Sequence, residues 1–257
     1  MKEFFGFGGY TREPEGYFSL EHLLFVTSLM IIMTALAIFF GKKYQNKNSN
    51  EKNKVLIWAA LLIDGFELFK IVLICFRAND PLGWKYDLPL FLCSIQLITI
   101  PLAAFSKGRI KEASLDFVMI FGLVGAFFGT YFAGQNYGCY PVLSFDNVVS
   151  GITHCISGFS ALYIMISKMN SMKKENMIIT FGILITFCVL AYIANITIDY
   201  NYMFLMAGDG TPYDIFYNLV NGNKILYPLI VVGLFFAYIS GFYYTYFIIT
   251  KNKNNKE

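Results

Sequence analysis

Two side chains of this sequence could act together as a nucleophile and its base: the thiol of Cys93 and the imidazole of His154. A neutral imidazole that takes the thiol proton leaves a thiolate, which attacks carbonyl carbon readily. Each residue lies inside a long apolar run. If the two runs are neighbours in space, the pair can carry out covalent acyl chemistry. The alternatives are that Cys93 is a small packed side chain and that His154 serves packing or gating.

Three ionisable residues follow one another at spacings of three on an earlier apolar run: Asp64, Glu67 and Lys70. On a helix they share an arc of about 120°, so all three can face the protein interior, and Glu67 can pair directly with Lys70. Ionisable groups inside a bilayer are costly and usually face protein or a wet cavity. The pair is therefore either a structural ion pair or part of a functional site.

Further polar residues fall at the same end of their runs as Cys93 and His154: His22, Gln96, Asn195, Asp199 and Asn201. We treat them as candidate supporting residues. The two histidines do not make a convincing zinc site without a third ligand, which Asp199 or Glu67 would have to supply. We therefore expect no metal and no cofactor.

These residues are positioned by seven apolar runs, most of them long enough to cross a hydrocarbon core of about 30 Å as helices. The fold class that we predict is all-α, a polytopic helical bundle in a membrane. The runs are Leu20–Phe40, Val55–Phe76, Leu88–Phe105, Ala113–Ala133, Val148–Ser167, Met177–Asp199 and Ile225–Thr250.

Composition agrees, because 56% of the 257 residues are hydrophobic and only 14% are charged. A soluble domain carries about 25% charged residues. We expect one membrane domain, with a polar segment at 1–18, the bundle at 19–250 and a basic tail at 251–257. The net charge of +3 does not indicate nucleic acid as a partner, since the basic residues lie on the joints between runs.

The orientation follows from the lysines and arginines outside the runs. Fourteen fall on one alternate set of joints and five on the other. Positive charge stays on the cytoplasmic side, so we expect the N-terminus outside and the C-terminus in the cytoplasm. Cys93 and His154 then lie in the outer halves of their spans. The first span lacks a small-residue cleavage site and is expected to be retained.

The third run suggests a helix that starts near its first residues. Asp87 is a plausible N-cap, and Pro89 suits the first turn. Cys93 would then lie one turn further in, on the same face as Gln96. Of the remaining cysteines, Cys75 and Cys139 both fall near the outer surface, and their pairing is left open.

The motifs at these residues resemble those of the YwaF-type bacterial integral membrane proteins, which are related to the transmembrane protein 164 acyltransferases. The likeness extends from about Phe18 to the last span, with one departure at Phe91, where other members tend to have His. The motifs that carry it are Glu67-x-x-Lys70, Leu88-Pro-Leu-Phe-Leu-Cys-Ser-Ile, Thr153-His-Cys and Asn201-Tyr-Met-Phe-Leu.

The resemblance implies acyl transfer on membrane phospholipids in a bacterial-type cell membrane. Cys93 takes the role of nucleophile and His154 that of its base, with an acyl-thioester as the intermediate. In that scheme Gln96 or Asn201 donates to the oxyanion, and Asp199 orients His154.

In the same scheme Lys70 holds a lipid phosphate, with Glu67 orienting it. The main alternative is a proton-coupled transporter or a lipid-binding sensor that uses Asp64, Glu67, Lys70 and Asp116. A receptor is suggested by span count alone, and fold does not imply function.

Overall fold

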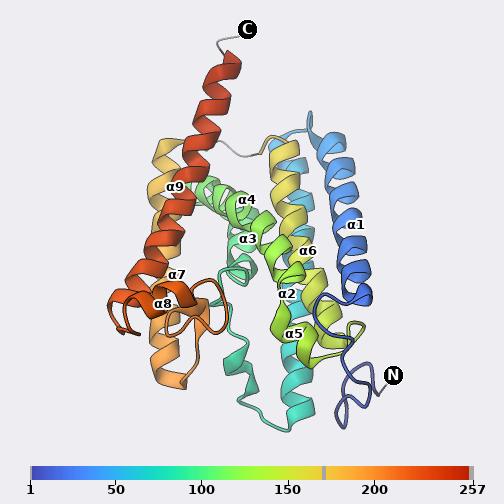
Figure 1. The fold of residues 1–257 in the computed structure, drawn as a ribbon. Helices are drawn as coiled ribbons and strands as arrows, with labels where there is room; N and C mark the ends of the chain where they lie inside the picture. The colour runs from blue at the N-terminus through green and yellow to red at the C-terminus, as the bar shows by residue number, and fades with distance from the viewer. Residues whose placement is uncertain (1, 170–171, 255–257) are drawn as a thin grey trace. The chain divides into compact units, whose positions relative to one another are not determined.

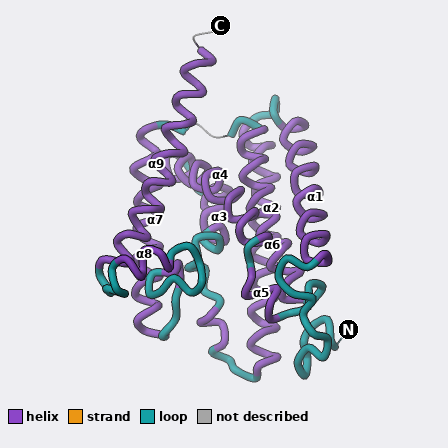
Figure 2. Tube along the Cα trace, viewed as in Figure 1, coloured by secondary structure: helices purple, strands orange, loops and turns teal. Residues whose placement is uncertain are grey.

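The computed structural model describes residues 2–169 and 172–254, and this part of the chain is helical without a strand (Figure 2). The elements are α1 Leu20–Tyr44, α2 Ser49–Ala78, η1 Gly83–Tyr86, α3 Gln96–Phe105, α4 Gly108–Tyr131, α5 Gly134–Cys139, α6 Phe145–Ile166, α7 Lys174–Ile198, η2 Tyr202–Phe204, α8 Asp214–Leu219 and α9 Leu226–Asn254 (Figure 1). The all-α expectation is confirmed for these residues.

Five helical segments among the described residues are long and apolar enough to cross a membrane: Leu20–Tyr44, Gly108–Cys139, Phe145–Ile166, Lys174–Ile198 and Leu226–Thr250. Helix α2 has the length but carries three ionisable residues in its middle, and α3 has only ten residues. The predicted tail begins inside α9, and its last residues, 255–257, lie outside the described part.

The chain divides into two compact units. Unit 1 comprises Met1–Pro89 and Gln96–Ser171, and unit 2 comprises Leu90–Ile95 and Met172–Glu257. In unit 1, α6 is central and packs against α1, α2 and α4, while α3 packs against α2 and α4. A buried cluster of aliphatic side chains, including Leu56, Ile100 and Val118, joins α2, α3 and α4.

Small residues let α4 and α6 approach closely. A Cβ on Gly122 would lie 3.3 Å from the carbonyl carbon of Ser157 and 3.1 Å from Cβ of Ala161. A Cβ on Gly158 would lie 2.7 Å from Cβ of Ala126. Small side chains on both helices therefore form the contact between α4 and α6.

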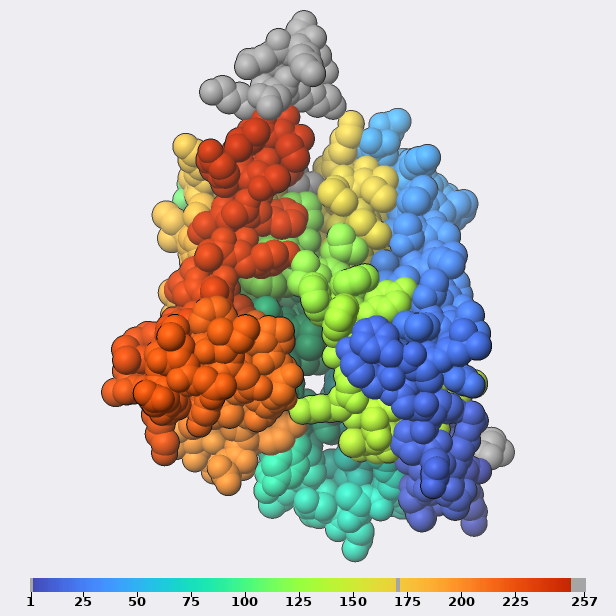
Figure 3. Space-filling model, viewed as in Figure 1, coloured from blue at the N-terminus to red at the C-terminus, as the bar shows by residue number. Residues whose placement is uncertain are grey.

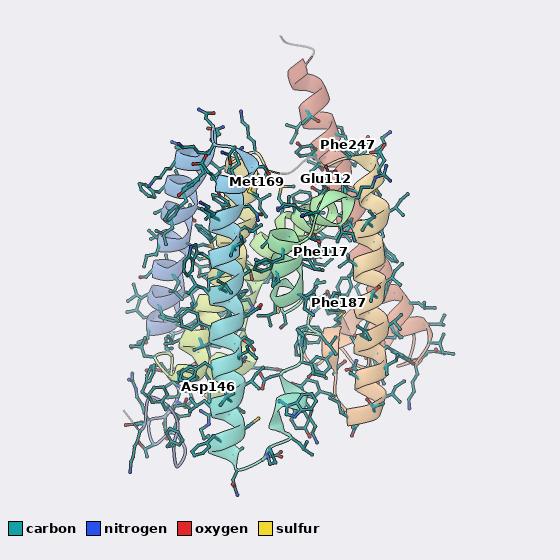
Figure 4. All side chains as sticks on the ribbon, turned by 180° about the vertical axis from the view of Figure 1, so that it is seen from behind. Glu112, Phe117, Asp146, Met169, Phe187 and Phe247 are labelled. Atoms are coloured by element: carbon teal, nitrogen blue, oxygen red, sulfur yellow. The ribbon has the colours of Figure 1, made fainter. Side chains whose placement is uncertain are left out.

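The N-terminal segment is tied to the end of unit 1 where α2 finishes and α6 begins. The Arg77 guanidinium donates to both carboxylate oxygens of Asp146, at 2.8 and 2.9 Å, and to the carbonyl of Phe5 at 3.1 Å. Tyr10 donates to the same carboxylate. Figure 3 shows this segment in dark blue beside α5, and Figure 4 labels Asp146 near the end of α2.

In unit 2, α7 and α9 pack together. The ring centroids of Phe181 and Phe236 lie 5.0 Å apart, and the hydroxyls of Thr180 and Tyr243 are 3.0 Å apart. Helix α7 ends at Ile198, and the left-handed backbone of Asp199 after it (φ 53°) turns the chain toward η2.

Candidate functional site

The imidazole of His154 is held in one tautomer by its own helix. Its Nδ1 lies 2.8 Å from the carbonyl oxygen of Ser150, one turn earlier on α6. A carbonyl only accepts, so Nδ1 carries the hydrogen and Nε2 is the basic nitrogen of the neutral ring. This is the arrangement that a general base needs, since the second nitrogen orients the ring and the first takes a proton.

The Nε2 edge of this ring rests against the backbone of α4 at Gly129. A Cβ built on Gly129 would lie 3.1 Å from Cε1 of His154 and closer still to Nε2 and Cδ2. No side chain larger than hydrogen fits there while the ring keeps its position. The sequence shows only a glycine in an apolar run, so Gly129 was not among the predicted site residues.

Cys93 lies in a non-helical turn, because α3 begins only at Gln96. The prediction that Asp87 caps this helix and that Pro89 occupies its first turn is therefore wrong. Leu92, Cys93 and Ser94, which were predicted to lie in the first turns of the helix, form a tight non-helical turn instead. Sγ of Cys93 lies 4.0 Å from Oγ of Ser94. The thiol is half-buried.

Phe91 anchors the Leu90–Ile95 segment within unit 2. Its ring centroid lies 5.0 Å from that of Tyr202 and 6.2 Å from those of Tyr200 and Phe204. Phe91 therefore fixes the cysteine-bearing segment to η2. Aromatic pairs at these separations stabilise a packed arrangement beyond the area that they bury.

Two asparagines of unit 2 shape the chain after α7. Asn195 donates to the carbonyl of Tyr202 at 3.0 Å and accepts from its N–H at 2.6 Å. Asn201 donates to the carbonyl of Ala207 and to the Asp209 carboxylate, at 2.8 and 2.7 Å. These bonds use both amide hydrogens of Asn201, so its role in the structure is to hold this loop.

Lys70 is the centre of a charged cluster in unit 1. Its Nζ lies 2.6 Å from Glu67 and 3.2 Å from Asp87, and all three side chains are at least three-quarters buried. The predicted Glu67–Lys70 pair is confirmed. Asp87, expected at a helix start, is instead the second carboxylate of the cluster.

Gln96 is fully buried at the first turn of α3. The hydroxyl of Thr99 donates to its Oε1 at 3.0 Å, which fixes the amide plane. Within the described residues, Nε2 of Gln96 has no hydrogen-bond partner. A buried amide donor without a partner is costly unless a ligand or water accepts from it.

His22 is fully buried and bonded at both nitrogens. Nδ1 accepts from the N–H of Phe18 and Nε2 donates to the carbonyl of Thr130, each at 3.1 Å. Its ring also packs on Tyr137 with centroids 3.9 Å apart. This neutral imidazole joins α1 to α4.

Cys93 and His154 belong to different units, and the structure describes each unit by itself, so their pairing stays a prediction, as does an orienting role for Asp199. All five cysteines are described and none forms a disulfide, including Cys75 and Cys139. No group of three potential metal ligands occurs among the described residues.

The fold and these sites define a class: a helical membrane protein with an oriented imidazole, a thiol in the turn before α3 and an ion-pair cluster. The chain belongs to the TMEM164 family, whose model matches residues 17–246. This confirms the family resemblance, while the narrower YwaF-type relationship stays a prediction. Neither a curated protein nor a solved structure matches the chain.

Proposed function

We propose that this protein is a membrane-embedded lipid acyltransferase that forms an acyl-thioester on Cys93. The observation that carries the proposal is the orientation of His154. Ser150 holds its Nδ1 hydrogen and Gly129 admits its Nε2 edge. An imidazole that is fixed in this way can take and return a proton without first reorganising.

The reaction requires Sγ of Cys93 to come within hydrogen-bond reach of Nε2 of His154. The thiol proton passes to Nε2, and the thiolate attacks the ester carbonyl of a phospholipid. The carbon–oxygen ester bond breaks, and His154 returns its proton to the lysophospholipid alkoxide. In the second half, His154 takes a proton from a lipid hydroxyl or water. That oxygen attacks the thioester, the carbon–sulfur bond breaks, and His154 returns its proton to the Cys93 thiolate.

The partnerless Nε2–H of Gln96 supports a role as donor to the oxyanion of each tetrahedral intermediate. Lys70 has one more ammonium hydrogen than its two carboxylate partners require, so it can hold a lipid phosphate. The reaction needs no cofactor.

The proposed topology has seven spans, with α2 and the α3 segment crossing in addition to the five long apolar helices. The N-terminus is outside and the C-terminus cytoplasmic. Phospholipid then enters from the outer leaflet of a bacterial-type cell membrane. Non-helical backbone at membrane depth is tolerated where it is enclosed by protein or lines a cavity, which suits the turn that carries Cys93.

The test is to incubate purified protein in lipid with a phospholipid that carries a labelled acyl chain. Wild type should retain label that neutral hydroxylamine releases, whereas Cys93→Ala should retain none. His154→Gln should form the thioester much more slowly, by roughly 100-fold or more, which is the usual contribution of a general base. Cys75→Ala, which removes another partly buried thiol, is the matched control.

Absence of label from folded wild-type protein would overturn the proposal. Transport or lipid sensing would then remain, and dependence on Glu67 rather than on Cys93 would indicate it.

A further inference from the structure

A groove in unit 1 is lined by Asp64 of α2 and by residues along α3. It has a volume of about 490 Å³, and its walls are apolar except at Asp64 and Ser106. Leu97, Pro101 and Phe105 line it at intervals of four residues, so they follow one face of α3 for about 12 Å at about 1.5 Å per residue.

Asp64 is the charged group of this groove and occupies the middle of α2. It lies about 20 Å from either end of the helix at about 1.5 Å per residue. Among the described residues it has neither a hydrogen bond nor an ion pair. The nearest cation on its helix, Lys70, is held by Glu67 and Asp87. A carboxylate at membrane depth is expensive without a partner and marks a functional site.

The other polar atoms of the groove are also acceptors. Pro101 has no N–H, so it cannot donate the helical hydrogen bond that the carbonyl of Leu97 would otherwise accept. The Ser106 hydroxyl gives its hydrogen to the carbonyl of Leu102. The groove therefore offers a carboxylate, a carbonyl and a hydroxyl oxygen as acceptors.

We propose that this groove binds the ammonium group of an amphipathic amine. The ammonium donates to Asp64 and to the carbonyl of Leu97, and the apolar tail lies along Pro101 and Phe105. A cation with three N–H donors matches a wall of acceptors, and a linear chain matches the apolar stripe. The proposal involves neither Cys93 nor His154 and stands independently of acyl transfer.

Two sources can supply such a group: a free long-chain amine, or the headgroup of an aminophospholipid. The probe is dodecylamine with a photoactivatable group in its tail, added to the full chain in phosphatidylcholine nanodiscs. Crosslinked peptides are then mapped by mass spectrometry. Label should appear on α2 and α3. Replacing part of the phosphatidylcholine with phosphatidylethanolamine should reduce it only if the headgroup is the source, and either result is consistent with an ammonium site.

The decisive comparison is between a neutral and a negatively charged side chain at position 64. Asp64→Asn should lower labelling by about tenfold, the effect of losing one charge-assisted hydrogen bond, whereas Asp64→Glu should retain it. Glu51→Gln removes a carboxylate from the first turn of the same helix and should have no effect. Equal labelling of wild type and Asp64→Asn would overturn the proposal.

A second readout uses wild type alone, in case Asp64→Asn does not fold. Dodecanol with the same photoactivatable tail has the same apolar chain but no positive charge. It should label α2 and α3 about tenfold less than the amine. Equal labelling by alcohol and amine would show a groove that binds apolar chains regardless of headgroup, which also overturns the proposal.

Discussion

Replacing Gly129 with alanine tests whether the position of the His154 ring controls the reaction. The new methyl group would overlap Nε2 and Cδ2 of His154, so the ring must move away from α4 or the two helices must separate. A displacement of about 1 Å at a catalytic group costs roughly 100-fold in rate. We therefore expect acyl transfer by Gly129→Ala to fall by about that factor.

The expected change in stability is small by comparison. Extra volume in a packed interior costs about 1–3 kcal/mol, while exchanging glycine for alanine within a helix recovers about 1 kcal/mol. The net loss is then no more than about 2 kcal/mol, which leaves the protein folded. A rate defect out of proportion to the stability defect is the signature of a displaced base.

The assay compares acyl transfer and thermal midpoint for wild type, Gly129→Ala and Gly182→Ala. Gly182 on α7 has no atom within 4 Å of an added Cβ, so its substitution should leave the rate unchanged. The reasoning is refuted if Gly129→Ala turns over at the wild-type rate. It is also refuted if the rate falls only as far as loss of folded protein explains.

Three further outcomes concern stability. Asn195→Leu should destabilise the protein by about 1–3 kcal/mol in denaturant unfolding, because it removes the Asn195 oxygen that accepts from the buried N–H of Tyr202 and one of the donors to the Tyr202 carbonyl; an unchanged midpoint would contradict this. Arg77→Met should lower the free energy of unfolding by roughly 3 kcal/mol, since Asp146 stays largely buried without the positive charge of Arg77. It should also speed proteolysis of residues 2–17, and resistance to protease equal to that of wild type would contradict this. Burial and the hydrogen bond to Asp146 raise the pKa of Tyr10 to about 12. The phenol therefore stabilises the fold fully below pH 10 and loses this contribution as pH rises toward 12. Wild type should lose more stability across that window than Tyr10→Phe; parallel curves would contradict this.

Hydropathy located the long helices well because an apolar run that crosses lipid must satisfy its backbone hydrogen bonds within its own helix. It failed at the third run, where Leu88 to Ile95 is as apolar as a helix but forms turns. Leu90–Ile95 packs through Phe91 onto η2, a contact more than a hundred residues away in sequence. Periodicity within the run contains no information about such a partner.

The ion-pair cluster also has one part that local spacing predicts and one part that only the folded chain shows. The spacing of Glu67 and Lys70 on one helix was enough to predict their pair, since residues three apart on a helix are neighbours. Asp87 joins them only because the chain returns after η1, and local propensity instead suggested a helix cap there. Similarly, Asn201 has the chemistry of an oxyanion donor, but the loop uses both of its amide hydrogens.

The sequence by itself determined the class of protein, the long helices and the residue types able to do chemistry, because hydrophobic run length and helical spacing are local properties. Only the tertiary structure decided that Gly129 admits the ring of His154, and that Gln96 keeps a buried amide without a partner among the described residues. These depend on how closely α4 approaches α6 and on where α3 begins, and close packing sets both through atoms far apart in the chain.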